Sequence, residues 1–289
     1  MPELPEVETM RRGIALVTGS RITGVERCPC RLRPIRIRPS LPSFRRRAIG
    51  QKIVEVARVG KRVVLRLDTQ EAVVFEPRMT GLVLVGGPPE PYREHLRFRL
   101  MLDGGAVTEL CYWDRRGLGS VQLLAPRDFA RQLGGDHVGP DALSLTPGAL
   151  EARLGRSRRA IKVALLNQRL VSGIGNLYAS EILHAAGIHP AARCSELTAD
   201  EWSRLAIAVR KTLREAIRCE GSTLSDGTYR TALWEVGDYQ SRHRVYGREG
   251  QPCHTCGRAV VERMVQSQRS TFFCGRCQPL RAGQGSRRR

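Results

Sequence analysis

Four cysteines near the C-terminal end are spaced as ligands of one metal ion. Residues 253–277 begin with Cys-His-Thr-Cys and end with Cys-Gly-Arg-Cys, and seventeen residues separate the two pairs. Two such pairs supply four thiolates to a tetrahedral zinc ion, and the residues between them suit two short strands. We therefore predict a small β-ribbon that binds one Zn²⁺ per monomer through Cys253, Cys256, Cys274 and Cys277. A module this short folds only with its metal.

The ribbon is either a structural clip or also a nucleic-acid contact, since its segment carries Arg258, Arg263 and Arg269.

The N-terminus combines a proline at position 2 with three glutamates, Glu3, Glu6 and Glu8. One interpretation is structural. A proline just ahead of an amphipathic helix, with carboxylates in the first turn, suits the positive end of the helix dipole. These residues alone leave open whether the same groups also do chemistry.

A glycine-containing turn, "VSGIG", precedes the segment "NLYASEILHAAG". Gly173 and Gly175 permit a sharp reversal and a close backbone approach, and we expect Asn176 at the N-cap of the next helix. Free N–H groups at a helix N-terminus suit a phosphate. The alternative is an ordinary capped helical hairpin.

The charge balance indicates a polyanionic partner. Lys and Arg number 48 against 28 acids, a formal charge of +20, and residues 242–289 contain eleven Arg and two Glu. Arginine suits forked phosphate contacts. Ribosomal and other RNA-binding proteins share this balance. However, only 15 of the 289 residues are aromatic (six Phe, three Trp, six Tyr), which gives little support to stacking along single strands.

No run of 18 apolar residues and no secretory signal pattern is present. We therefore expect a cytoplasmic protein with reduced thiols, in which most of the other five cysteines are ordinary small residues. Nothing in the sequence indicates self-association, so a monomer is expected.

The first 130 residues are mostly of strand type, after an N-terminal helix within 7–17. Branched residues dominate 52–67, 71–86 and 94–113, and Asp103-Gly104-Gly105 marks a hairpin turn. A Gly- and Pro-containing boundary near 133–145 leads to helical segments. Thr146-Pro147 predicts one helix start, and Thr198 with Glu201 predicts a capping box at another.

Three features occur in order along the chain: PELPEVE, GIGNLYASEIL and the CxxC…CxxC ribbon. This set resembles the formamidopyrimidine-DNA glycosylase/endonuclease VIII family of base-excision repair enzymes, and PELPEVET is similar to its formamidopyrimidine branch. The resemblance spans nearly the whole chain. It implies an α+β fold with an N-terminal catalytic β-sandwich domain and flanking helices (1–132), a helix-two-turn-helix DNA-binding domain with a lesion-capping loop (146–242), a zinc-ribbon finger (243–280) and a basic tail (281–289).

The resemblance also implies a catalytic group at the N-terminus. Removal of Met1 would expose Pro2 as a secondary amine, the family's nucleophile at C1′ of a damaged nucleoside. An α-amino group has a pKa of about 8 against about 10.4 for lysine, so more of it is unprotonated near neutrality. Glu3 takes the position of the general acid/base, and Lys61 that of a hairpin lysine that grips a phosphate and assists β-elimination. Glu6 matches an acid near the lesion pocket; a carboxylate that only pairs with the helix dipole is the alternative.

Further positions are carried over from the family to hold DNA. Met79, Arg116 and Leu118 would fill the gap left by an everted base, whose unstacking costs roughly a few kcal/mol. Arg269 matches a ribbon arginine that assists δ-elimination. Positions matched to DNA contacts are Arg93, His95, Arg158, Lys162, Asn176, Tyr246 and Arg263.

The chain departs from the family pattern in three places. Leu118 stands where phenylalanine is usual, and Glu76 where a phosphate-contacting histidine is common. Residues 223–243 replace the usual lesion-capping loop, and Tyr229, Trp234 and Tyr239 there either stack on an everted base or pack the loop.

We therefore expect a DNA glycosylase and abasic-site lyase that excises oxidised purines (8-oxoguanine, formamidopyrimidines) from double-stranded DNA by β,δ-elimination. One alternative is a family member with shifted lesion specificity. Another is a non-catalytic, zinc-dependent binder of damaged or structured DNA, although such a binder needs none of Pro2, Glu3 and Lys61. An RNA-binding zinc-ribbon protein would explain the charge but not the N-terminus.

Overall fold

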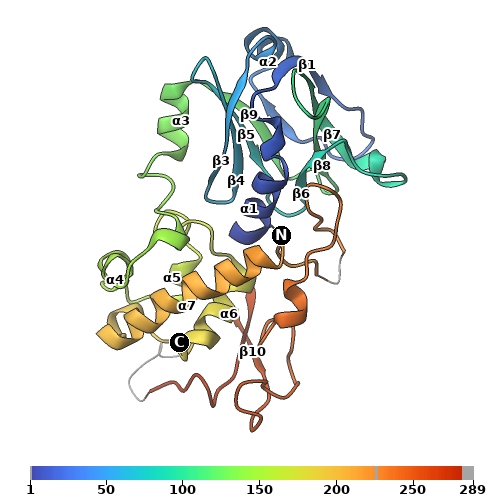
Figure 1. Ribbon diagram of the computed structural model, residues 1–289. Coiled ribbons are helices and arrows are strands. Elements are labelled where there is room, and N and C mark those ends of the chain that lie inside the picture. Colours follow the sequence, from blue (N-terminus) through green and yellow to red (C-terminus); the bar gives the residue numbers. More distant parts are fainter. Residues whose placement is uncertain (1, 225–226, 282–289) are drawn as a thin grey trace. The chain divides into compact units, whose positions relative to one another are not determined.

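The computed structural model describes residues 2–224 and 227–281 and contains two compact units (Figure 1). The first consists of Met1–Gly134 and Ile217–Gln240, and the second of Gly135–Ala216 and Ser241–Arg289. The chain thus leaves the first unit and returns to it before the C-terminal ribbon.

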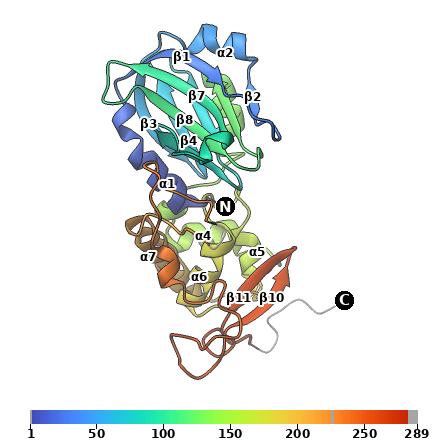
Figure 2. The same cartoon turned by 90° about the vertical axis from the view of Figure 1, so that its right-hand side faces the viewer.

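Two β-sheets form the first unit (Figure 2). The four-stranded sheet has the order β1 (Arg21–Arg27), β7 (Leu96–Asp103), β8 (Glu109–Asp114), β6 (Gly81–Val85). The five-stranded sheet has the order β2 (Arg36–Arg38), β9 (Ser120–Leu124), β5 (Ala72–Glu76), β4 (Arg62–Leu67), β3 (Ile53–Val59). All pairings are antiparallel except that of β2 with β9.

The inner faces of the two sheets share one apolar core. The ring of Phe75 on β5 lies 6.4 Å from that of Phe98 on β7 and 5.8 Å from that of Tyr112 on β8. The branched residues of β4 and β5 are buried because both faces of these strands are covered. The α+β class and the N-terminal sandwich predicted from the sequence are confirmed.

Three α-helices belong to the first unit: α1 (Leu4–Gly13), α2 (Leu41–Ala48) and α3 (Pro126–Leu133). Helix α1 inserts Val7 and Met10 into the sandwich core, while Phe44 of α2 packs against Phe98. Short 3-10 turns occur at η1 (Ala15–Val17) and η2 (Tyr92–His95). The predicted hairpin after Asp103 joins β7 to β8, with Gly104 at φ +74°.

The second unit consists of helices and a two-stranded ribbon. Its elements are η3 (Ala142–Ser144), α4 (Pro147–Leu154), α5 (Ile161–Leu165), α6 (Asn176–Ala186), η4 (Cys194–Glu196), most of α7 (Ala199–Arg218), η5 (Tyr239–Arg242, at its margin), β10 (Glu262–Gln266) and β11 (Arg269–Phe273). The two predicted starts are present. Thr146 Oγ1 accepts the N–H of Ala149 at 3.2 Å, and Thr198 and Glu201 form a reciprocal capping box.

Helix α6 begins one residue earlier than predicted. Its N-cap is Gly175, and Asn176 is the first helical residue. The side chain of Asn176 is therefore free of the capping role and reaches the ribbon, as described below. The helix ends at Ala186, and Gly187 caps it in a left-handed conformation (φ +67°) that suits glycine.

Within residues 2–224 and 227–281, no helix has both the length and the apolar character needed to cross a membrane.

Candidate active site and metal centre

The predicted catalytic acids lie at the buried start of α1. Glu3 is the N-cap residue of this helix, and its backbone N–H donates to Glu6 Oε2 at 2.8 Å. Pro2, Glu3 and Glu6 are all buried. The structural interpretation of the acidic N-terminus thus holds, since these carboxylates cap a helix, and it places Pro2 directly before the cap.

The second oxygen of Glu6 contacts a distant segment of the first unit. Glu6 Oε1 accepts the backbone N–H of Ser222 at 2.9 Å. Gly221 allows this approach, because a Cβ there would lie 2.8 Å from Glu6 Oε1 and its φ is +82°. Ser222 was not found from the sequence, since only the fold brings it to α1.

Residues 227–240, in the segment predicted to replace a lesion-capping loop, pack within the first unit. Trp234 places its ring 5.1 Å from that of Tyr92 and 5.6 Å from that of Trp113. Tyr229 is 4 % exposed and donates its hydroxyl hydrogen to the carbonyl of Glu220 at 2.9 Å. Tyr239 is also buried. Of the two interpretations of these aromatic residues, the geometry favours packing; residues 225–226 of this segment lie outside the described part.

Lys61 lies on the turn between β3 and β4, where Gly60 has a φ of +57°. Arg58 links this turn to α1: its Nε donates to Glu8 Oε2 at 3.1 Å and its Nη1 to the carbonyl of Gly60 at 3.0 Å. The hairpin that carries the predicted lysine is therefore fixed to the helix that carries the predicted acid.

The three residues predicted to fill the gap of an everted base lie on two neighbouring loops. Met79 is 39 % exposed, so it is not a core methionine. Arg116 is exposed and Leu118 is half-buried. The side chains are thus available at the surface of the first unit.

Asp114, which the sequence did not single out, connects these two loops. Oδ1 of its buried carboxylate accepts two hydrogen bonds, from the Thr80 hydroxyl at 2.5 Å and from the backbone N–H of Arg116 at 3.1 Å. Its Oδ2 accepts the N–H of Gly119 at 2.8 Å. One carboxylate therefore fixes the loop after β5 relative to the loop after β8.

Glu76, the unexpected acid, pairs with a neighbouring arginine. Arg62 Nη2 lies 3.1 Å from Glu76 Oε1, and the Ser120 hydroxyl lies 3.5 Å from Glu76 Oε2. Glu76 also lines a cavity of about 240 Å³ together with Arg33, Arg36 and Arg78. The arginines around it offset the repulsion that a lone carboxylate would exert on a phosphate.

Two further predicted DNA contacts of the first unit differ in accessibility. Arg93 is exposed and lies 3.5 Å from Glu90. His95 is 9 % exposed, its ring packs edge-on to Trp113, and burial lowers its pKa. Arg93 is accessible to a ligand, whereas His95 is mainly a packing residue.

In the second unit, Lys162 and Asn176 form a buried polar cluster with the ribbon. Lys162 is 1 % exposed, and its Nζ donates to Asn176 Oδ1 and Thr271 Oγ1, each at 2.7 Å, and to the carbonyl of Ser270 at 3.1 Å. Asn176 Nδ2 also donates to the Ser270 carbonyl at 3.0 Å. Lys162 thus orients Asn176 and β11, and its match to a DNA contact stays a prediction.

The remaining predicted contacts lie on or near the ribbon or on an exposed loop. Arg269 is exposed at the start of β11, and Arg263 is exposed on β10. The ring of Tyr246 packs against Phe272 at 5.1 Å. Arg158 is exposed before α5.

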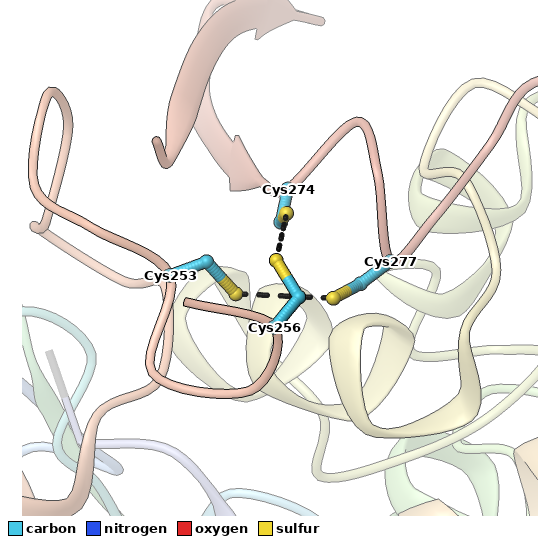
Figure 3. A group of neighbouring side chains, drawn as sticks. All are labelled: Cys253, Cys256, Cys274 and Cys277. Atoms are coloured by element: carbon cyan, nitrogen blue, oxygen red, sulfur yellow. Dashed lines mark hydrogen bonds between the residues drawn. The ribbon is translucent and has the colours of Figure 1, made fainter. Parts of the chain in front are cut away.

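Four cysteines converge beside the ribbon (Figure 3). All four sulfurs of Cys253, Cys256, Cys274 and Cys277 lie within 4.8 Å of one another. The backbone N–H of Arg258 contributes most to lowering the pKa of Cys256 to about 6. Four sulfur ligands this close together suit a tetrahedral thiophilic dication such as zinc.

The sequence matches three family models in succession. Residues 1–121 match the formamidopyrimidine-DNA glycosylase N-terminal domain, residues 138–228 its H2TH domain, and residues 250–280 a zinc finger found in FPG and IleRS. The formamidopyrimidine-DNA glycosylase of Chloroflexus aggregans is 40% identical over 284 residues, which cover 97% of this chain and 99% of that protein. The chain belongs to the formamidopyrimidine-DNA glycosylase family.

Other members of this family agree in sequence and in fold. The formamidopyrimidine-DNA glycosylase of Bacillus subtilis is 37% identical over 282 residues, covering 96% of this chain and 99% of that protein. The Fpg protein of Thermus thermophilus superposes with a TM-score of 0.82 at 38% identity, covering 96% of this chain and 98% of that one. A Lactococcus lactis Fpg mutant, solved with DNA containing Fapy-dG, gives a TM-score of 0.83 at 28% identity over 96% of this chain and 100% of that one.

The family match also settles the metal. The zinc-finger model covers all four cysteines, and their sulfurs are clustered as a zinc ion requires. The protein binds one Zn²⁺ per chain, as the cysteine spacing predicted.

Proposed function

We propose that the protein is a bifunctional DNA glycosylase and abasic-site lyase of base-excision repair that removes oxidised purines from double-stranded DNA. The observation that carries this proposal is the N-terminus: Pro2 directly precedes a buried Glu3 that caps α1, in a chain that matches the glycosylase family over nearly its full length. Relatives of this fold have been solved with DNA containing Fapy-dG and with DNA containing an abasic site.

The proposed chemistry begins with the nitrogen of Pro2, freed by removal of Met1. This nitrogen bonds to C1′ of the damaged nucleoside while the bond from C1′ to the base nitrogen breaks and the base leaves. Glu3 protonates the sugar ring oxygen, so that the sugar opens and the C1′–N bond becomes an iminium. The iminium acidifies the C2′ protons, which permits β-elimination of the 3′ phosphate. The rigid cap around Glu3 supports this role, because a general acid must be held within hydrogen-bond distance of its target.

The hairpin around Lys61 is proposed to hold the phosphate beside the lesion. Its fixation to α1 through Arg58 and Glu8 supports this assignment, since the lysine and the acid then keep a constant separation. Arg269, exposed on the ribbon, would assist the second elimination.

Met79, Arg116 and Leu118 are proposed to fill the gap left by the everted base. The exposure of Met79 and the tie between its loop and the Arg116 loop through Asp114 support this role. Asn176, Arg263, Tyr246, Arg158 and Arg93 would contact phosphates. The protein would act as a monomer in the cytoplasm on nucleoid DNA.

Borohydride trapping tests the proposal. The zinc-loaded protein is incubated with duplex DNA that contains 8-oxoguanine, a formamidopyrimidine or an abasic site, and the iminium is then reduced. We expect a covalent protein–DNA adduct with each duplex and none with a Pro2→Gly variant that binds the same DNA. Mass spectrometry of the adduct should place the link at residue 2, with Met1 absent.

A non-catalytic binder of damaged DNA is the second candidate. The paired Glu76 and the aliphatic Leu118 favour it, because both depart from the family pattern at positions that the resemblance assigns to DNA contact. Binding to all three duplexes without any trapped adduct, the abasic duplex included, would establish the binder and exclude the enzyme.

A further inference from the structure

One histidine, which is not among the four predicted zinc ligands, contacts the sulfur of one of them. His184, on the last turns of α6, places its Nε2 at 3.6 Å from Cys253 Sγ. Both residues are buried, at 4 % and 1 % exposure. The ring therefore meets the sulfur away from water, where a hydrogen bond is stronger than at a surface.

No hydrogen bond to the other ring nitrogen of His184 competes for the ring hydrogen in the described part of the chain. His184 Nδ1 is buried and has no hydrogen-bond partner among residues 2–224 and 227–281. A neutral imidazole carries its hydrogen on one nitrogen only. With Cys253 bound to zinc as a thiolate, the favourable form has the hydrogen on Nε2, which donates to the sulfur.

The four-thiolate site needs such donors. Four thiolates around one Zn²⁺ leave a net charge of −2, and N–H groups that point at the sulfurs stabilise it. Cys256 receives the backbone N–H of Arg258 and of Ala259, and Cys274 those of Arg276 and Cys277. At Cys253 the donor is a side chain from another element.

Hydrogen bonds before and after His184 hold α6 and the residues that follow it against the C-terminal segment. Glu181, one turn before His184, accepts the backbone N–H groups of Val245 and Tyr246 at 3.0 and 2.8 Å. Gln278, next to the last zinc ligand, donates its Nε2 hydrogen to the carbonyl of Ile188 at 2.8 Å. The helix is thus attached to the zinc module on both sides of His184.

We propose that His184 is a positioning residue of the zinc centre. Its Nε2–H donates to the Cys253 thiolate, fixes the orientation of that ligand and slows loss of the metal. The same contact joins the helix-two-turn-helix domain to the ribbon through the metal, so that zinc occupancy stabilises α6 as well as the finger.

Three substitutions in the full-length, zinc-loaded protein test this proposal. His184→Phe keeps a ring but removes the donor, whereas His184→Gln keeps an N–H donor. His189→Leu is the control: it removes a different imidazole near the finger, one that is half-buried and packs against Phe273 rather than on a sulfur. Zinc affinity is measured by chelator competition, and the thiolate-to-metal charge-transfer band is recorded after Co²⁺ substitution.

We expect His184→Phe to weaken zinc binding about 10- to 100-fold and to move the charge-transfer band to longer wavelength, because the sulfur loses a hydrogen bond. His184→Gln should restore most of the affinity, and His189→Leu should match the parent. Equal affinity and spectra for His184→Phe and the parent would overturn the proposal. So would equal weakening by Phe and Gln, which would indicate packing alone.

A measurement on the unsubstituted chain keeps the test independent of how the variants fold. After replacement of zinc by ¹¹³Cd, a hydrogen bond from Nε2–H to the thiolate transmits a scalar coupling between that proton and the metal. Detection of this coupling at the His184 ring supports the proposal, and its absence in a fully loaded, well-resolved sample refutes it.

Discussion

Glu6 and Glu8 are two residues apart on α1, yet their carboxylates serve different partners. Glu6 accepts backbone N–H groups from Glu3 and Ser222, one on each oxygen. It fixes the peptide that follows Pro2 and, at the same time, the segment that begins near Gly221. The lesion-pocket role assigned by resemblance therefore stays a prediction, and the geometry adds that Glu6 holds the surroundings of the proposed nucleophile.

Glu8 instead binds guanidinium groups, and this gives a pH-dependent contribution to stability. Burial by itself would raise its pKa, but hydrogen bonds from Arg11 and Arg12 and the charge of Arg58 lower the pKa from 4.5 to about 2. A carboxylate with a lower pKa in the folded state stabilises the fold above its unfolded pKa. This contribution, on the order of 3 kcal/mol, is lost as the pH falls from about 4.5 to about 2.

We predict that Glu8→Gln lowers the free energy of unfolding at pH 7. The difference between the parent and the variant should shrink steadily between pH 4.5 and pH 2. Urea unfolding of the first-unit signal over this range measures both values. Glu151→Gln, an exposed acid on α4, serves as the control and should follow the parent at every pH. A difference that does not change with pH would contradict the assignment.

A site whose residues lie close together in the sequence can be predicted from the sequence alone. The four zinc ligands occur as two local pairs, so their spacing alone revealed the metal. Asp114, Ser222 and His184 could not be found this way, because each acts on a segment more than 30 residues away, and only packing brings the partners together. Lys162 is a different case: the resemblance matched it to a DNA contact, whereas in the fold its side chain is buried against the ribbon.

At the scale of elements, local signals predicted most helices, strands and turns. Thr146, the Thr198–Glu201 pair and the Asp103–Gly105 turn mark boundaries through short-range chemistry, and the structure confirms them. The attachment of residues 217–240 to the sandwich was not predictable in the same way. It depends on the ring of Trp234 meeting Tyr92 and Trp113, which no local pattern encodes.

Two loops that carry the proposed gap-filling residues behave as one element because of Asp114. In Asp114→Asn, one carboxylate oxygen becomes an NH₂ group that cannot accept the N–H of Gly119. We predict a loss of about 1–3 kcal/mol in stability and faster amide exchange at residues 115–119. The rate of excision of a damaged base should fall by a larger factor than the affinity for the same duplex.

Hydrogen exchange followed by mass spectrometry measures the amide exchange at 115–119. Single-turnover assays measure the rate of excision. Asp128→Asn, on α3 of the same unit, is the control, since that acid pairs only with Arg131 on the helix surface among the contacts seen. Unchanged exchange at 115–119 in Asp114→Asn would show that the loops do not depend on this carboxylate.

For the whole molecule, the charge indicated the class of partner but not the arrangement of the chain. An excess of +20 is spread over both units and predicts a steep fall in DNA affinity with salt. The predicted domain limits at 132, 146, 242 and 280 remain predictions. The structure groups 217–240 with the first unit, a division set by long-range contacts that composition does not report.

Zinc should stabilise only part of the molecule, because the two units have separate cores. The first unit has its own apolar core of two sheets, whereas the finger of the second depends on its four cysteines. Zinc binding to such modules supplies roughly 10–16 kcal/mol of folding free energy. Removal of zinc by a chelator should therefore unfold residues 250–280, loosen α6 through the lost contacts at His184 and Ser270, and weaken DNA binding. The amides of β4, β5 and β8 should keep their protection from exchange.

Readdition of Zn²⁺ should restore the parent pattern, whereas Cys256→Ser should not recover it. If the sandwich lost protection together with the finger, the two units would share one cooperative transition, and the separation of their cores would not govern stability.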